Sequence, residues 1–130
     1  MTQIRAVRDV ASEDGDDVRL SLRMRLGHGV RLGPGKIRLL EAIDDTGSIS
    51  AAARSMGMSY RRAWLLVDSI NQAMAEPVVE SHSGGARGGG ARLTPGGHEI
   101  IRLYKAMEEK ALQAVATELD ALGALARAPD

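Results

Sequence analysis

The segment GGARGGGARLT (84–94) carries five glycines and two arginines in eleven residues. Exposed backbone N–H groups and guanidinium groups together can bind phosphate, either on a nucleotide or on a nucleic-acid backbone. A nucleotide-binding P-loop ends in Lys-Ser or Lys-Thr and enters a helix, whereas Gly90 is followed by Ala91, Arg92 and a predicted strand. A dinucleotide-binding turn also needs a following helix. Contact with a nucleic acid is therefore favoured, with a plain flexible hairpin as the alternative and a nucleotide-binding enzyme as a weaker one.

Two more arginines, Arg61 and Arg62, follow Ser59 and Tyr60 in a segment with helical periodicity. With Ala63 at the centre of the buried face, Arg61 falls about 160° away toward solvent, and Arg62 about 260° away on a flank. Arginine binds guanine edges with two hydrogen bonds or clamps phosphate. The Ser59 hydroxyl and the free N–H groups of the first turn can also reach phosphate. A solvated helix face is the alternative for the arginine pair.

The elements that must position these side chains follow from hydrophobic spacing and from helix-end residues. The segment VRLSLRMRL (18–26) alternates apolar and polar residues, which predicts one half-buried strand. The segment GHGVRLGPG (27–35) is rich in turn residues and predicts a bridge. Pro34 suits the first turn of a helix, and Gly47 suits the left-handed residue that ends it.

A short helix is predicted at ISAAARSM (49–56), capped by Ser48 or Ser50 and stopped by Gly57. Ser59 would cap a third helix, SYRRAWLLVDSINQAM. Its predicted buried stripe has helical spacing and consists of Ala63, Leu66, Val67, Ile70 and Met74.

Two short strands, starting at Val78-Val79 and covering 91–94, flank the glycine-rich segment and predict a hairpin. A last helix opens at Pro95 and, after Gly97, meets no helix breaker before Gly123. It would run for more than about 25 residues, or ~40 Å at ~1.5 Å per residue.

The order helix, short helix, turn, helix and hairpin is that of a winged helix-turn-helix, whose third helix enters a major groove. Ala53, four residues before Gly57, is small enough for the two helices to cross closely. We expect a mainly α fold with a small β-hairpin and a long C-terminal dimerisation helix. The expected divisions are a mobile N-terminal arm (1–17), the winged helix-turn-helix (18–97) and the long helix (98–127).

The last helix carries an apolar stripe at spacings of three and four residues, formed by Leu112, Val115, Leu119 and Leu122. Such a stripe would be exposed on a monomer, and two copies can bury each other's. We therefore expect a homodimer. The alternative is that the helix folds back over its own domain.

Composition limits the function classes. The 130 residues include no cysteine, which excludes disulfides and thiolate metal sites, and no apolar run is long enough to span a membrane. No secretion signal is recognisable, so we expect a cytoplasmic location. The net charge is zero, but residues 19–98 carry eleven basic and six acidic residues, a net of +5, between two acidic ends. The local charge is what a phosphate experiences.

Other chemistries find no support in the residue inventory. His28, His82 and His98 lie far apart without an acidic cluster, so no metal or other cofactor is expected. Ser59 has no neighbouring base with a supporting acid, which argues against an enzyme. The aromatics Tyr60, Trp64 and Tyr104 are too few for a base-stacking surface, and packing is favoured over base contact for Trp64.

The stretch GSISAAARSMGMSYRRAWLLVDSIN (47–71) resembles the DNA-binding domain of molybdate-responsive regulators of the ModE type, and its first part also resembles the LysR-type helix-turn-helix. The combination of SYRRAW with GGARGGGARLTPGG (84–97) is closer to the ModE pattern. The resemblance implies a dimeric winged-helix transcription factor. By match of motif it implies DNA contact at Ser59, Tyr60, Arg61, Arg62, Arg87 and Arg92.

ModE-type members with a sensor carry C-terminal oxyanion-binding domains, and this chain ends at Asp130, directly after the long helix. The expectation is a ModE-like regulator without an oxyanion-sensing domain, whose effector or sensor protein is unknown. Its partners would be a second copy and double-stranded DNA with an inverted repeat, and no membrane. The alternative function is a winged-helix protein-interaction module that acts without direct DNA binding.

Overall fold

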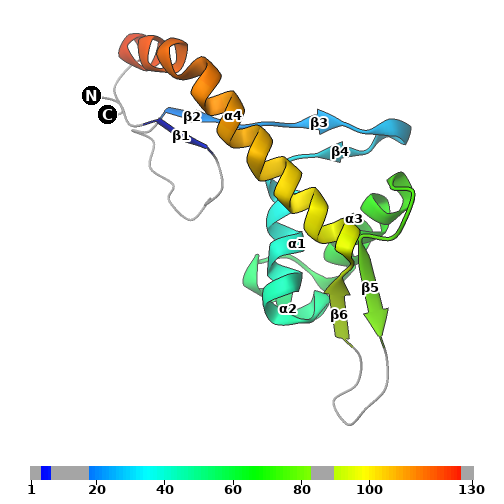
Figure 1. Ribbon diagram of the computed structural model, residues 1–130. Coiled ribbons are helices and arrows are strands. Elements are labelled where there is room, and N and C mark those ends of the chain that lie inside the picture. The colour runs from blue at the N-terminus through cyan, green and yellow to red at the C-terminus, as the bar shows by residue number, and fades with distance from the viewer. Residues whose placement is uncertain (1–3, 7–17, 83–89, 127–130) are drawn as a thin grey trace. The chain divides into compact units, whose positions relative to one another are not determined.

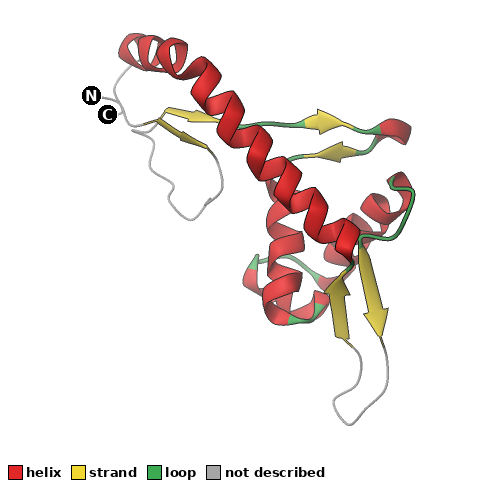
Figure 2. Cartoon of the chain, in the orientation of Figure 1, coloured by secondary structure: helices red, strands yellow, loops and turns green. Residues whose placement is uncertain are grey.

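The computed structural model describes residues 4–6, 18–82 and 90–126 (Figures 1 and 2). The chain divides into two compact units, one formed by residues 23–103 and the other by residues 1–22 together with 104–130. No helix within the described part of the chain is long and apolar enough to cross a membrane.

Three helices form the centre of the 23–103 unit: α1 (Pro34–Thr46), α2 (Ile49–Ser55) and α3 (Tyr60–Ala73). Gly47 ends α1 in the left-handed conformation, with φ of 72°, and its N–H donates to the Ile43 carbonyl. Ser48 caps α2 by accepting from the Ala51 N–H, and Ser59 caps α3 by accepting from the Arg62 N–H. The helix ends predicted from sequence are confirmed, and Ser48 rather than Ser50 is the cap.

The helices pack on one hydrophobic core that also includes the two strands of the wing hairpin. The predicted stripe of α3 is confirmed at Ala63, Val67 and Ile70, which are buried, while Leu66 and Met74 pack partly buried against the same core. The fully buried side chains of α1 are Leu39, Leu40 and Ile43. This burial fixes which face of α3 is turned outward.

Two hairpins complete this unit. In the first, β3 (Met24–Arg25) pairs antiparallel with β4 (Arg31–Leu32) across the short 3-10 helix Gly27–Gly29. In the second, β5 (Val79–His82) pairs antiparallel with β6 (Gly90–Leu93). The second hairpin is the predicted wing, and residues 83–89 between its strands lie outside the described residues.

The prediction of one strand over residues 18–26 is wrong. The segment holds two strands, β2 (Val18–Leu20) and β3, which pair with different partners, β1 (Ile4–Ala6) in parallel and β4 antiparallel. The predicted bridge likewise contains β4. Alternation along a sequence indicates which face a side chain takes, but it carries no information about the pairing partner.

The wing and the last helix, α4 (Pro95–Leu125), meet at Thr94 and Gly97. The Thr94 hydroxyl donates to the Pro77 carbonyl at 2.8 Å and accepts from the Gly97 N–H at 3.1 Å. A Cβ at Gly97 would overlap the backbone carbonyl oxygen of Val78. Gly97 is therefore required for the close approach of α4 to the start of the wing, which its position in the sequence alone does not reveal.

The second unit contains β1, β2 and the part of α4 from Tyr104 onward. Tyr104 is buried, and its hydroxyl donates to the Leu22 carbonyl at 2.8 Å. α4 spans 31 residues, which confirms the predicted long helix. Of the predicted N-terminal arm (1–17), only β1 lies within the described residues, where it forms a strand. The domain boundaries proposed from sequence remain predictions.

Candidate nucleic-acid interface

The turn between α2 and α3 has the construction predicted from its small residues. Ala53 and Ala63, one on each helix, are fully buried, so the helices approach without intervening side chains. Gly57 adopts φ of 68°, a conformation that side-chain-bearing residues rarely take. The Met58 N–H then donates to the Ala53 carbonyl at 3.0 Å. This turn fixes the angle at which α3 leaves α2 and presents its first turn to solvent.

The first turn of α3 brings together four of the residues singled out from sequence. Ser59 is the cap, and Tyr60, Arg61 and Arg62 follow it, all of them exposed. The Ser59 oxygen accepts the Arg62 N–H at 3.1 Å, which leaves its own O–H free to donate outward. The earlier N–H groups of the turn have no acceptor within the helix. This end of α3 therefore offers several donors to an anion.

The outward face of α3 also carries large apolar groups. Tyr60 is 55% exposed, Trp64 45% and Leu65 47%. The expectation that Trp64 mainly packs is therefore met only in part, because almost half of its surface is open. Apolar side chains on an outward helix face can contact the methyl group of thymine, as arginine contacts guanine. The outward face of α3 carries both arginine and large apolar side chains.

On the wing, Arg92 is placed on β6 with its side chain 74% exposed. Its Nε lies 3.6 Å from Oε2 of Glu80, the residue opposite it in the β5–β6 register. An exposed pair of this kind contributes only about 0–1 kcal/mol, so it holds Arg92 weakly. Arg87, predicted at the wing tip, lies outside the described residues.

A small groove lies where the wing meets the starts of α2 and α3. Its volume is about 290 Å³, and its lining consists of Ser48, Ile49, Ser50, Tyr60, Ser81, His82, Gly90 and Ala91. The Ala91 N–H donates to the Gly47 carbonyl at 2.9 Å, which ties β6 to the turn between α1 and α2. A Cβ at Gly90 would overlap the His82 ring. The wing is thus seated directly against the helix-turn-helix.

Asn71 also fixes the wing and was missed by sequence reasoning. Its Oδ1 accepts from the N–H groups of Val78 at 2.7 Å and Val79 at 3.2 Å, and its Nδ2 donates to the Val79 carbonyl at 3.2 Å. Asn71 thereby joins α3 to the start of β5. A clue was available, because asparagine is a poor helix former and lies here near the buried face of a helix.

Replacing Asn71 by leucine is expected to lower the free energy of unfolding by about 1–3 kcal/mol, because two part-buried N–H groups of the wing lose their acceptor. Urea denaturation followed by circular dichroism measures this. Asn71→Asp, which keeps the acceptor oxygens, is the matched variant and is expected to lose less. Equal stability of the leucine variant and the wild type would show that Asn71 does not anchor the wing.

The four residues expected to form the dimer seam lie on α4 in the second unit. In the single chain Leu119 is only 9% exposed and Leu122 is 62% exposed, so the expected exposed stripe is interrupted at Leu119, and the dimer seam itself remains a prediction. Leu112 and Val115 are half-buried. Exposed large apolar side chains of this unit are Met107, Leu122 and Leu125.

Comparison with known proteins places this geometry in context. Residues 35–98 match the model of the bacterial regulatory helix-turn-helix proteins of the lysR family. The chain is 48% identical over 95 residues to the molybdenum-pterin-binding protein MopB of Rhodobacter capsulatus, covering 72% of this chain and 35% of that protein. It is 40% identical over 83 residues to the DNA-binding transcriptional dual regulator ModE of Escherichia coli strain K12, covering 64% and 32%. The chain spans about a third of the length of these relatives.

Among solved structures, the crystal structure of a CbnR_DBD–DNA complex is similar with a TM-score of 0.52 at 18% sequence identity. The match covers 68% of this chain and 95% of the other. It confirms the fold as a mainly helical winged helix-turn-helix with small hairpins and a long C-terminal helix.

Proposed function

Residues 35–98 form a helix-turn-helix domain that belongs to the lysR family of bacterial regulatory proteins and is homologous to the N-terminal region of ModE regulators, and we propose that the protein regulates transcription by binding specific sites in double-stranded DNA. The family is one of regulators rather than enzymes. The observation that carries the proposal is the exposed first turn of α3, where Ser59, Tyr60, Arg61 and Arg62 all face solvent.

In this proposal α3 lies in the major groove with its N-terminal end at the base edges. Arg61 points away from the core and contacts a base, with guanine as its best partner because the guanidinium group matches O6 and N7. Arg62, on the flank, and the Ser59 hydroxyl contact backbone phosphate. Tyr60 lies on the opposite flank. The wing adds Arg87 and Arg92, which contact phosphate or the minor groove.

The protein acts as a homodimer in this proposal. One helix and one wing contact only a few base pairs, too few to select a site in a genome. Two copies related by a two-fold axis bind an inverted repeat whose half-sites lie about one helical turn, or a multiple of it, apart. The exposed Leu122 on α4 supports an interface there, together with the half-buried Leu112 and Val115. Leu119, only 9% exposed in the single chain, completes the proposed seam of Leu112, Val115, Leu119 and Leu122.

Selection of bound duplexes from a random pool tests the function. The expected result is enrichment of an inverted repeat, because a two-fold dimer presents two copies of α3 to the DNA. Recovery of no common sequence would contradict sequence-specific binding. If the protein binds no duplex at all, the alternative of a protein-interaction module is favoured.

A further inference from the structure

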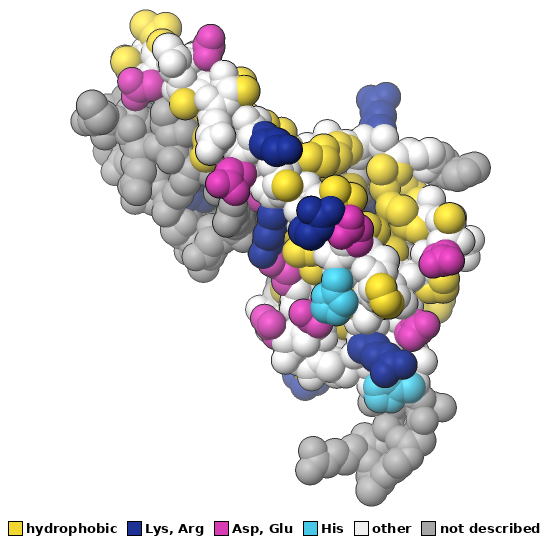
Figure 3. All heavy atoms as spheres, in the orientation of Figure 1, with side chains coloured by type: hydrophobic (Ala, Val, Ile, Leu, Met, Phe, Trp, Pro, Cys, Tyr) yellow, Lys and Arg dark blue, Asp and Glu magenta, His cyan; other side chains and the backbone are white. Residues whose placement is uncertain are grey.

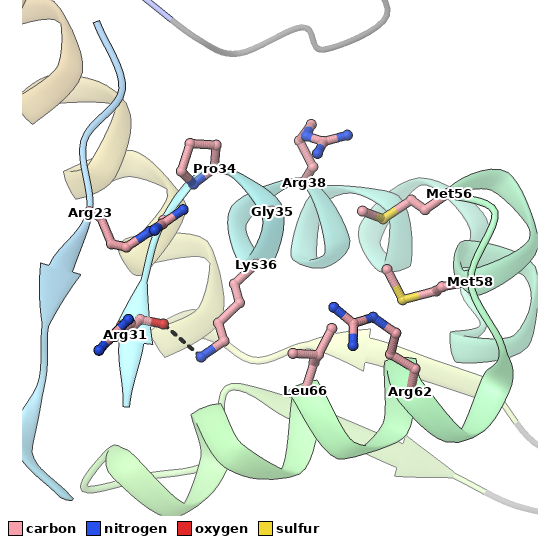
Figure 4. A pocket seen from close by; sticks show the side chains of 11 residues that line it. Arg23, Arg31, Pro34, Gly35, Lys36, Arg38, Met56, Met58, Arg62 and Leu66 are labelled. Atoms are coloured by element: carbon pink, nitrogen blue, oxygen red, sulfur yellow. Dashed lines mark hydrogen bonds between the residues drawn. The ribbon is translucent and has the colours of Figure 1, made fainter. Parts of the chain in front are cut away.

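The 23–103 unit contains a pocket of about 360 Å³ between α1, α3 and the β3–β4 hairpin (Figure 4). Five positively charged side chains line it, and they come from segments far apart in the sequence: Arg23, Arg31, Lys36, Arg38 and Arg62. Figure 4 shows Lys36 from α1 and Arg62 from α3 extending into the space between the two helices, and Arg23 reaching toward it from the hairpin. The pocket collects positive charge that no single stretch of sequence shows.

No carboxylate among the described residues pairs with these side chains. Within the described part of the chain, none of the five side chains has an acidic group within 4.0 Å, whereas Arg92 and Arg102 elsewhere each pair with a glutamate. On the face seen in Figure 3, by contrast, basic and acidic side chains lie beside one another. Like charges gathered without counter-charges repel one another, so the pocket favours a bound anion.

The hydrogen bonds of the pocket leave donors available. The Lys36 ammonium donates to the Arg31 carbonyl at 2.6 Å, which accounts for one of its three hydrogens. The Arg38 Nε is buried and has no hydrogen-bond partner among the described residues. Gly33 caps α1 without a side-chain acceptor, so the first N–H groups of α1 at this pocket are also uncapped.

The ionisation of Lys36 agrees with this picture. Partial burial, and secondarily the positive charge of Arg31, lower the pKa of the Lys36 ammonium below its usual value. A bound anion would offset both effects and raise the pKa again. The charged pocket is therefore more stable when it holds an anion than when it is empty.

We propose that this pocket binds one phosphate group of the DNA backbone, beyond the contacts made by the outward face of α3. Arg62 belongs both to the proposed contact of α3 with DNA and to the pocket, because it lies on the flank of α3 and also lines the pocket. A flank of a helix in the major groove faces one of the two phosphate strands that border the groove. Arg23 and Lys36 then extend the phosphate contact from α3 to α1 and the β3–β4 hairpin. The proposal rests on DNA binding as the function of the protein.

The test uses the full chain with the double substitution Arg23→Gln and Lys36→Gln. The matched control is Arg25→Gln with Lys110→Gln, which removes the same charge at two exposed positions outside the pocket. Affinity for the selected duplex and for a random duplex is measured over a range of salt concentrations. We expect the salt slope of the pocket variant to fall by about two units, one for each copy of the proposed dimer, and that of the control to stay closer to the wild type.

A second measurement identifies the phosphate. Single methylphosphonate substitutions along each strand of the selected duplex remove one phosphate charge at a time. At one position the substitution is expected to weaken the wild type several-fold and to leave the pocket variant unaffected. Melting of each variant is followed to confirm that it remains folded. An unchanged slope and an unchanged methylphosphonate profile in a folded pocket variant would overturn the proposal while specific DNA binding stands.

A free oxyanion could also occupy the pocket in place of a DNA phosphate. A separate experiment distinguishes these two ligands. Inorganic phosphate and sulfate are added to the protein without DNA, and the melting temperature is recorded. Stabilisation of the wild type and not of the pocket variant, with an unchanged methylphosphonate profile, would assign the pocket to a free anion and overturn the DNA assignment. Failure of the wild type to bind any duplex would instead refute the proposed function itself.

Discussion

If the protein is the proposed dimer, replacing Leu122 by aspartate is expected to convert it to a monomer and to weaken binding to the inverted repeat by about a hundredfold or more. Leu122 is 62% exposed, so its replacement removes an apolar contact of the proposed dimer while leaving the packing within the single chain largely unchanged. Two aspartates facing each other across a two-fold axis would also repel. Each copy then binds its half-site alone, and the affinity gained by binding both half-sites at once is lost.

Gln113→Asp is the matched control for this substitution. Gln113 is exposed on the same part of α4, nine residues before Leu122, which places it about 180° away around the helix. It introduces the same charge on the opposite face and is expected to leave the dimer intact. Sedimentation equilibrium measures the assembly, and duplex titration measures the affinity. A wild type that sediments as a monomer at micromolar concentration and binds its site tightly would contradict the dimer.

Leu122 is preferred to Leu119 for this experiment because of burial. Leu119 is only 9% exposed, and a charge there would be buried without a partner. Its replacement by aspartate would unfold part of the second unit and so confuse loss of dimerisation with loss of structure. The exposed position separates these two effects.

Replacing Arg61 by alanine is expected to cost about 1–3 kcal/mol of binding free energy on the selected site and to relax the base preference at one position per half-site. Arg61 is exposed and turned away from the buried residues Ala63 and Val67, so the substitution leaves the core intact. Arg102→Ala, an exposed arginine of α4, removes the same charge elsewhere. Affinities for duplexes altered at single positions measure the preference. If the substitution weakens binding to specific and random duplexes equally, Arg61 contacts only phosphate.

Local chemistry made the helix-turn-helix predictable from sequence. Ser48, Ser59 and Gly47 each act through groups within four residues of themselves, so a single sequence reveals the ends of the helices. The faces of α3 follow from the 3.6-residue period in the same way. The exposed positions of Arg61 and Arg62 on α3 therefore follow from the sequence alone.

Features that join distant segments were not predictable in this way. Asn71 binds the start of β5, and the pocket assembles Arg23, Lys36 and Arg62 from three separate elements. Leu119 has the spacing of an exposed seam and is nevertheless buried. In each case the deciding contact depends on the tertiary structure, which periodicity and capping residues do not encode.

Recognition of a specific sequence in double-stranded DNA is measured by competition binding. The wild type is titrated with the selected inverted repeat and with a scrambled duplex of equal length and composition, at salt concentrations from about 50 to 200 mM. We expect both affinities to fall with salt and the inverted repeat to keep an advantage of about a thousandfold or more. Equal affinity for the two duplexes at every salt concentration would contradict it.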